Sequence, residues 1–345
     1  MNKYAAAIRM LNEGKKPDID LSKLLYKHNC PYLLKKLSVQ NSGTENFLNK
    51  IAVTERYKQC AELFNKFKVL NIPYAVIKGA VLSNIAYKNP FTRHSGDIDI
   101  IISRQYVDTV KKILLDDNFV QGRVTVKGIE PFTRKELLFQ ASMTHQTAPF
   151  IKETLNKLCP HVNVDVNLDI MWGESERKAD MEYVLRNTVD TELFGIEFKK
   201  LCTEMEFISL CLHHYKDMNS IYLLYERGLK LGHYCDIYYY VKNAPISLSK
   251  LKAFCDTLGV SQYVYYCLYY TNLIFEDSQL DDYIKAVYSE SCNEILQTFG
   301  LTDKEKQPWK IDFFTRLFDT NLHEYLKDNL DKVLLDKIKT NKSLM

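Results

Sequence analysis

The stretch KGAVLSNIAYKNPFTRHSGDIDI, residues 78–100, carries the strongest structural signal in the chain. The apolar run YAVI (74–77) precedes it and is typical of a short buried strand, which Gly79 ends. Residues 80–87 then predict a helix, so that a helix N-terminus follows directly on the end of a strand. A strand, a glycine and a helix in this order predict a place where backbone N–H groups can approach an anion closely.

Two aspartates lie two positions apart in the next predicted strand, DIDIII (97–102). Side chains at this spacing point to the same side of a strand, and their Cα atoms are about 6–7 Å apart. Two carboxylates this close repel each other, and a hard divalent cation removes that cost. We therefore expect Asp97 and Asp99 to bind Mg²⁺, with Mn²⁺ as the alternative ion, beside the phosphates of a substrate.

A third carboxylate is expected from HVNVDVNLDIMW (161–172), where apolar and polar residues alternate. This pattern predicts a strand with one packed face and one open face. Asp165 lies on the open face and is the favoured partner of the aspartate pair in a site for two metal ions about 4 Å apart. Asp169 is the alternative and is expected to be solvated.

A phosphate site is expected beside these acids. The backbone of Gly79 and Ala80 can approach a phosphate, and Arg93 offers a fork of N–H donors. Further along the chain, a polar helix stripe carries two basic residues. The residues expected to contact a nucleotide are Lys78, Gly79, Ala80, Arg93, Ser95, His213 and Lys216.

The aspartate pair alone is weak evidence, because Gly-Asp often forms a turn and Ile-Asp-Ile is a plausible structural strand. The order of the elements is more specific. A strand ending in Lys-Gly-Ala, a helix, an aspartate pair on a strand and a later strand with acids follow one another as phosphate chemistry with metal ions requires.

The remaining patterns predict an α+β fold with a small mixed sheet, flanking helices and a helical C-terminal half. The predicted parts are a helical segment (1–70), a catalytic core (71–200) and a helical domain (201–345). Within the core, we expect a helix over 106–118 and a hairpin formed by 119–129 and 136–142.

Composition narrows the class of protein. The 46 Lys and Arg against 43 Asp and Glu give a net charge of +3, which is low for a dedicated nucleic-acid binder. Nine cysteines without a CxxC pair argue against a zinc site and indicate buried thiols in a reducing compartment. No signal peptide or membrane span is evident, so we expect a cytoplasmic protein without a membrane partner.

The residues 78–100 also resemble the nucleotidyltransferases of the DNA polymerase β superfamily, and most of all their bacterial branch. The likeness rests on Lys-Gly, a helix with Tyr87, then an Arg and Gly-Asp-Ile-Asp ending at Asp99. It extends over about residues 50–245, where LCLHHYKD and GHYCDIYYYVK also fit. Two positions depart from the branch: Ala80 replaces a Ser or Gly, and Asn167 replaces a His.

The resemblance implies Mg²⁺-dependent transfer of a nucleoside monophosphate from an NTP to an acceptor, with release of pyrophosphate. Near-neutral charge favours a small-molecule acceptor over tRNA or protein. Two alternatives stay open: a nucleotidyltransferase-like toxin acting on tRNA or protein, and a catalytically silent nucleotide-binding scaffold.

Overall fold

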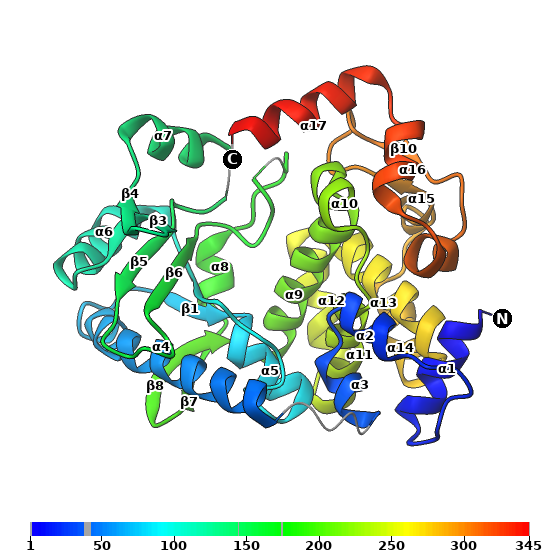
Figure 1. Ribbon diagram of the computed structural model, residues 1–345, viewed down its shortest axis with the longest axis horizontal. Helices are drawn as coiled ribbons and strands as arrows, with labels where there is room; N and C mark the ends of the chain where they lie inside the picture. The colour runs from blue at the N-terminus through cyan, green and yellow to red at the C-terminus, as the bar shows by residue number, and fades with distance from the viewer. Residues whose placement is uncertain (1, 38–42, 144, 174, 345) are drawn as a thin grey trace. The chain divides into compact units, whose positions relative to one another are not determined.

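The chain folds into two compact units (Figure 1). The computed structural model describes residues 2–37, 43–143, 145–173 and 175–344. The sheet unit consists of Gln40–Ser209 with Asn243–Ser247, and the helical unit holds Met1–Val39, Leu210–Lys242 and Leu248–Met345. The predicted three-part division remains a prediction. The helical unit combines residues up to 39 with the C-terminal helices. The long helix that follows residue 39 belongs to the sheet unit.

The sheet unit is built on one mixed sheet, which confirms the predicted α+β class. Within the described residues it has eight strands, in the order β4 (Gly128–Pro131), β3 (Val120–Thr125), β5 (Phe150–Glu153), β6 (His161–Asn167), β2 (Asp97–Ile102), β1 (Tyr74–Ile77), β8 (Ile196–Leu201) and β7 (Thr188–Leu193). β6 and β2 are parallel, as are β1 and β8, and the other neighbours are antiparallel.

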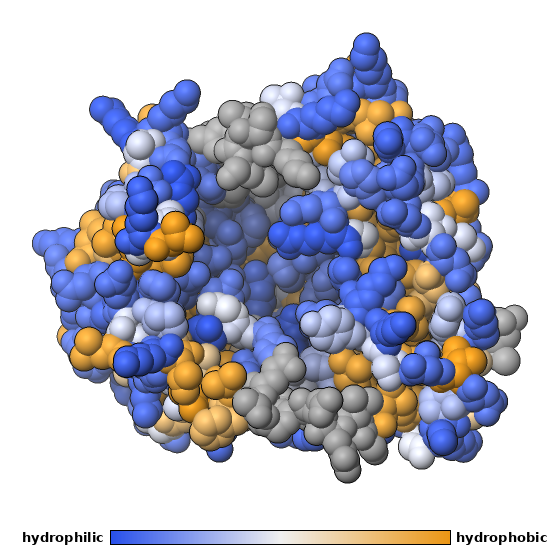
Figure 2. Space-filling view, viewed as in Figure 1, coloured by the Kyte–Doolittle hydropathy of each residue, from blue (hydrophilic) through white to orange (hydrophobic). Residues whose placement is uncertain are grey.

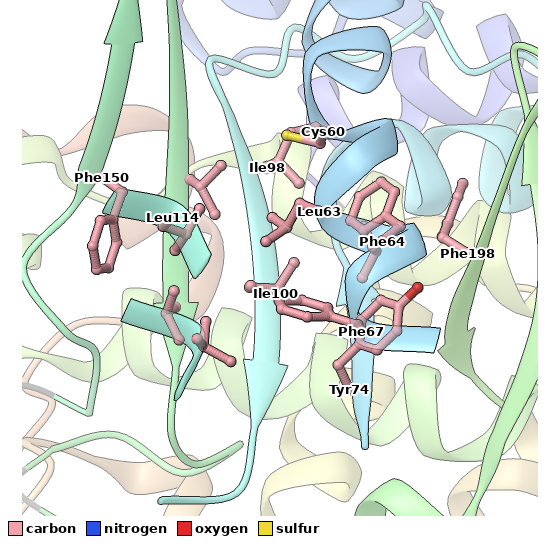
Figure 3. Packing of buried hydrophobic residues seen from close by; sticks show 14 of the residues in the cluster. Cys60, Leu63, Phe64, Phe67, Tyr74, Ile98, Ile100, Leu114, Phe150 and Phe198 are labelled. Atoms are coloured by element: carbon pink, nitrogen blue, oxygen red, sulfur yellow. The ribbon is translucent and has the colours of Figure 1, made fainter. Parts of the chain in front are cut away.

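The sheet unit also contains helices. They are α4 (Gly43–Val69), α5 (Gly79–Tyr87), the 3₁₀ turn η2 (Arg104–Tyr106), α6 (Val107–Asp116), α7 (Arg134–Met143) and α8 (Met181–Arg186). Of these, α4, α5 and α6 pack against the sheet. α4 lies along one face of the sheet, and its Leu63, Phe64 and Phe67 point at the strands (Figure 3). The Phe67 ring meets the Tyr74 ring of β1 edge-on, with centroids 4.8 Å apart. Burying each such ring stabilises the unit by about 2–3 kcal/mol.

Strand periodicity determines which face of the sheet carries acids. Ile98, Ile100 and Ile102 of β2 belong to the apolar cluster under α4. Successive side chains of a strand alternate between faces, so Asp97 and Asp99 project from the opposite face. The hydrophobic contact with α4 therefore fixes the register of β2 and, with it, the side on which both carboxylates emerge.

The helical unit contains the remaining elements. In chain order these are α1 (Lys3–Asn12), α2 (Ser22–Lys27), α3 (Pro31–Lys36), α10 (Ile221–Arg227), α11 (Leu231–Asn243), α12 (Leu248–Leu258), α13 (Ser261–Phe275), α14 (Gln279–Val287), α15 (Cys292–Gln297), β9 (Thr298–Phe299), β10 (Gln307–Pro308), the π-helical turn η3 (Thr315–Asp319), α16 (Leu322–Asn329) and α17 (Lys332–Leu344). α9 (Thr203–Asn219) begins in the sheet unit and continues in this one. Tyr234, Tyr240 and Tyr266 are fully buried, so these tyrosines pack in the core.

All nine cysteines are buried free thiols, as their spacing predicts. Hydrophilic residues make up most of the face shown in Figure 2, with hydrophobic residues in small separate groups. Among the helices that the structure describes, none is both long enough and apolar enough to cross a bilayer.

Three predictions about elements need correction. The predicted hairpin of 119–129 with 136–142 is wrong: β3 pairs with β4, and the second segment is helix α7. The predicted strand 161–172 ends at Asn167, because Leu168 and its successors turn away from β2. The sequence analysis also gave no element between the end of that strand and Thr203, where α8, β7 and β8 lie.

Candidate active site

Three carboxylates leave the sheet on one face, next to one another. Asp99 of β2 lies opposite Asp165 of β6, and Asp97 lies opposite Asn163. In a parallel pair, register partners point to the same face, and neighbouring strands are about 4.8 Å apart. Asp97 and Asp99 share that face because they are two residues apart. The three acids therefore surround one region of the sheet surface.

The electrostatics of the acids reflect this crowding. Burial raises the pKa of Asp165 to about 7, and the negative charges of Asp99 and Asp97 add to that shift. Burial likewise raises the pKa of Asp97, with the charge of Asp99 as the next cause. The ammonium of Lys78 acts in the opposite direction on both groups. The site thus holds more negative charge than its protein surroundings compensate.

Lys78 stands between the end of β1 and the start of α5, facing the acids. Its Nζ lies 3.2 Å from Oδ1 of Asp99, and the two side chains are 16% and 10% exposed. Its backbone has φ 58° and ψ −148°, a conformation that residues other than glycine rarely adopt. The backbone of Lys78 is therefore strained, and its side chain pairs with an acid.

Gly79 continues this turn and begins α5. Its φ is +46°, and a Cβ added there would lie 2.9 Å from Oγ of Ser95. That hydroxyl donates to the carbonyl of Asp97 at 3.0 Å. The first turn of α5 is thereby packed against the loop that leads into β2. Ala80 follows with its side chain buried, so its backbone is what it could offer to a ligand.

The loop before β2 is held by side chains from two helices. Ser83 of α5 accepts a hydrogen bond from the backbone N–H of Arg93 at 3.1 Å. From α4, Asn49 donates to the carbonyl of Arg93 at 3.3 Å, and Arg56 donates to the carbonyl of Ser95 at 2.5 Å. Asn49 and Arg56 are not predictable from the sequence, since one asparagine and one arginine in a long polar helix carry no distinguishing pattern.

Asn167, which departs from the resembled pattern, sits directly behind the acids. It is 1% exposed and donates to Oδ1 of Asp99 at 3.1 Å and to the carbonyl of Ile100 at 3.2 Å. Its own side-chain oxygen accepts from Gln146 at 2.7 Å. The amide therefore fixes the orientation of the Asp99 carboxylate.

Asp169 is not the solvated residue that the sequence analysis expected. It is 4% exposed, beyond the end of β6, and its Oδ1 accepts from the backbone N–H groups of Met171 at 2.9 Å and Ala179 at 3.3 Å. These bonds make it a support of the backbone at Met171 and Ala179. Of the two candidates for a third carboxylate, the register places Asp165 beside Asp99.

The donor set suits a hard cation. Three buried or half-buried carboxylates with one ammonium among them offer the oxygen ligands that Mg²⁺ or Mn²⁺ prefers. In the part of the chain that the structure describes, no group of three or more His, Cys, Asp or Glu side chains is arranged so that it could hold a metal ion as it stands. On Asp99, Oδ1 is taken by Lys78 and Asn167.

The two basic residues predicted from the helical half lie on α9, in the helical unit. Nε2 of His213 is 3.5 Å from Oδ2 of Asp217, and Nζ of Lys216 is 3.3 Å from the other oxygen of that carboxylate. Nearby, buried His214 pairs with Asp236 at 3.1 Å. The nucleotide contacts expected of His213 and Lys216 stay predictions, as do those of Arg93 and Ser95.

One protein-family model matches most of the chain. The model of a family described as uncharacterised nucleotidyltransferase matches residues 22–276. No curated protein matches the chain. Among solved structures, an antigenic nucleotidyltransferase-like protein from Paracoccidioides brasiliensis is similar, at 16% identity and a TM-score of 0.38, covering 69% of this chain and 92% of that one.

Proposed function

This chain belongs to the family of uncharacterised nucleotidyltransferases, and from that premise we propose that it transfers a nucleoside monophosphate from an NTP to an acceptor, releasing pyrophosphate. The proposal includes membership of the DNA polymerase β superfamily, in its bacterial branch. Support comes from the order of elements: β1, the Lys78–Gly79 turn, α5, the aspartate pair of β2 and the acid of β6.

One observation carries the proposal above all others. Asp97, Asp99 and Asp165 project from the same face of two registered parallel strands, beside a turn that opens a helix. A structural strand pair has no need for three acids there, because their mutual repulsion and burial raise two of their pKa values. A site that binds cations and phosphates together gains from each of these charges.

The metal would be held by Asp97, Asp99 and Asp165. Magnesium, or manganese in its place, would supply positive charge next to the phosphates when bound. The protein's own contribution is to keep the three carboxylates in fixed positions. Register pins Asp99 against Asp165, and the amide of Asn167 orients the Asp99 carboxylate from behind.

The triphosphate would lie at the start of α5. The backbone N–H groups at Gly79 and Ala80 belong to the first turn of the helix, where such groups have no partner within the helix itself. Lys78 comes directly before Gly79 and Arg93 follows α5 in the sequence, and both would add positive charge for the phosphates. Ser95 supports the turn through its contact with the Asp97 carbonyl.

In the proposed reaction, a hydroxyl oxygen of the acceptor forms a bond to the α-phosphorus. The bond from that phosphorus to the bridging oxygen of the β-phosphate breaks, and pyrophosphate leaves with the electron pair. The hydroxyl proton goes to Asp165, which lies beside the aspartate pair and whose pKa, raised by burial to about 7, suits a base that works near neutral pH.

The proposed acceptor is a small molecule, since a net charge of +3 offers little general attraction to tRNA. The free buried thiols suit the cytoplasm as the place of action. A toxin acting on tRNA or protein predicts growth arrest upon expression that Asp97→Asn relieves. A small-molecule enzyme predicts normal growth.

Incubation with α-labelled NTPs, Mg²⁺ and a panel of small hydroxyl and amine acceptors tests the activity. The expected result is label transfer with stoichiometric pyrophosphate, lost in Asp97→Asn and in Asp99→Asn. The proposed roles fail if those variants bind NTP with Mg²⁺ as tightly as the parent.

A catalytically silent scaffold is the second candidate, and the contacts of Asp99 favour it. One oxygen of this carboxylate is engaged by both Lys78 and Asn167. A scaffold would bind NTP in the same assay without releasing pyrophosphate with any acceptor.

A further inference from the structure

We propose that Lys78 is a built-in counter-cation: its ammonium occupies the acidic face when no nucleotide is bound and moves to the triphosphate when an NTP arrives. Metal and nucleotide would then bind together, and neither would bind tightly alone. This inference rests on the proposed function and adds to it a coupling between metal and nucleotide binding that the reaction itself does not require.

The contact between Lys78 and Asp99 differs from ordinary surface pairs. Lys68 and Glu197, in the same unit, are 72% and 75% exposed and exchange easily with water. The Lys78 and Asp99 side chains are 16% and 10% exposed, so each has lost most of its hydration. A desolvated ammonium needs a partner, and it will leave Asp99 only for another anion.

The ammonium occupies one of the two oxygens that Asp99 could offer to a metal ion. It lies 3.2 Å from Oδ1 of Asp99, and Asn167 donates to the same oxygen. Two donors leave that oxygen little capacity to accept a further bond. A divalent ion reaching Asp99 must displace the lysine or accept a like charge a few ångströms away, and both options weaken its binding.

The backbone of Lys78 is what places the ammonium between two anion sites. Its φ of 58° with ψ −148° is a strained conformation for a residue with a Cβ. This turn sends the side chain to the acids, while the next residue begins α5. From one position, the lysine is next to both the carboxylates and the helix start where the triphosphate is proposed to lie.

Charge explains why the switch favours joint binding. Without ligands, Lys78 offsets part of the charge of Asp97, Asp99 and Asp165. An incoming NTP with its metal ion brings anions for the lysine and a cation for the carboxylates in one step. A metal ion alone provides no anion for the displaced ammonium, and a free NTP alone would draw the ammonium away and leave the three acids without a cation.

Removal of the ammonium therefore has effects of opposite sign. In Lys78→Met, Mn²⁺ alone is expected to bind about tenfold tighter or more, because a competing cation is gone. The Mn²⁺ complex of a non-hydrolysable ATP analogue is expected to bind at least about tenfold weaker. A lysine that merely supports the fold would weaken both, and one that contacts phosphate alone would leave Mn²⁺ binding unchanged.

The test is titration of Mn²⁺ at pH 8, with and without the analogue, followed by the electron paramagnetic resonance signal of free Mn²⁺. Lys78→Gly is the second variant, because glycine suits the backbone at this position and protects against a folding defect. Lys152→Met is the matched control. It removes a pair of similar exposure, 18% and 19%, and similar length, 3.1 Å to Asp117, away from the acids.

The counter-cation is supported if both Lys78 variants bind Mn²⁺ alone more tightly and the Mn²⁺–analogue complex more weakly. Lys152→Met should change neither affinity. Unchanged or weaker binding of Mn²⁺ alone overturns it. Asp99→Asn separates this failure from a failure of the proposed function. If Asp99→Asn loses the Mn²⁺–analogue complex, the proposed function stands even where the counter-cation is wrong, whereas full retention removes both.

Discussion

Asp99 of β2 and Asp165 of β6 are register partners in a parallel strand pair, so their carboxylates leave the sheet side by side. They lie 66 positions apart in the sequence, with β3, β4, α7 and β5 between them. This pairing joins the aspartate pair to a third acid. It depends on the apolar contacts of Ile98 and Ile100 with α4 on the other face of the sheet.

Replacing Asp97 or Asp165 by Asn should lower the rate of pyrophosphate release at least about 100-fold, because each removes charge stabilisation of several kcal/mol from the transition state. The fold should be retained, since each change removes like-charge repulsion. Steady-state kinetics and a thermal melt measure the two effects. An active Asp165→Asn enzyme would show that another group completes the site.

Asp165 and Asp169, the two candidates for the third carboxylate, should respond in opposite ways to replacement by alanine. Asp169→Ala leaves the backbone N–H groups of Met171 and Ala179 without their acceptor and should cost about 1–3 kcal/mol of unfolding free energy. Asp165→Ala should leave stability unchanged or raise it, because a buried like charge disappears. Urea unfolding at pH 7.5, without divalent metal, compares them. Equal losses would contradict the assignment of separate roles.

Gly79→Ala should destabilise the sheet unit by about 1–3 kcal/mol. The fold would hold alanine at a φ of +46°, which a residue with a Cβ rarely adopts, and that Cβ would approach Ser95 Oγ to 2.9 Å. Gly96→Ala is the matched control from the same loop. A Cβ there meets nothing within 4 Å, so stability should change by less than about 0.5 kcal/mol. Chemical denaturation of both variants measures the change in unfolding free energy. Equal changes would mean that the turn at residue 79 is not constrained.

Stability should depend on pH through Glu206, which is 3% exposed. Burial raises its pKa to about 6 despite Lys200 at 3.0 Å. A raised pKa means that the folded state favours the protonated acid. Its contribution is complete below about pH 4.5 and is lost as pH rises through 6. Relative to Glu206→Gln, the parent should lose about 2 kcal/mol between pH 4.5 and pH 7.

The control for this pH dependence is Glu197→Gln, whose side chain is 75% exposed. Urea unfolding over the same pH range measures both variants. A Glu206→Gln difference from the parent that does not change with pH would show that the Glu206 carboxyl titrates as it does in water.

Much of the sheet unit was predictable because short-range patterns specify it. The strands at 74–77 and 97–102 and the helix between them follow from apolar runs and one glycine. The alternation that begins at His161 identifies β6, and with it the face of Asp165. These features depend on residues close in sequence, so periodicity reveals them.

Other features depend on contacts between distant residues, which a single sequence does not display. Residues 136–142 carry apolar side chains that suit a strand, yet they form α7 because β4 already pairs with β3. Arg56 reaches the loop at Ser95 from 39 positions away. The burial of Asp169 likewise depends on a loop that returns ten residues later. Tertiary structure determines all three.

The central claim is that Asp97, Asp99 and Asp165 together bind the metal ion of an NTP complex. Crystals soaked with Mn²⁺ and a non-hydrolysable ATP analogue, measured at the manganese absorption edge, test it most directly. The account predicts an anomalous peak bonded to oxygens of these carboxylates, with the triphosphate at the start of α5. An ordered nucleotide elsewhere, or a manganese ion with none of the three acids among its ligands, would contradict it.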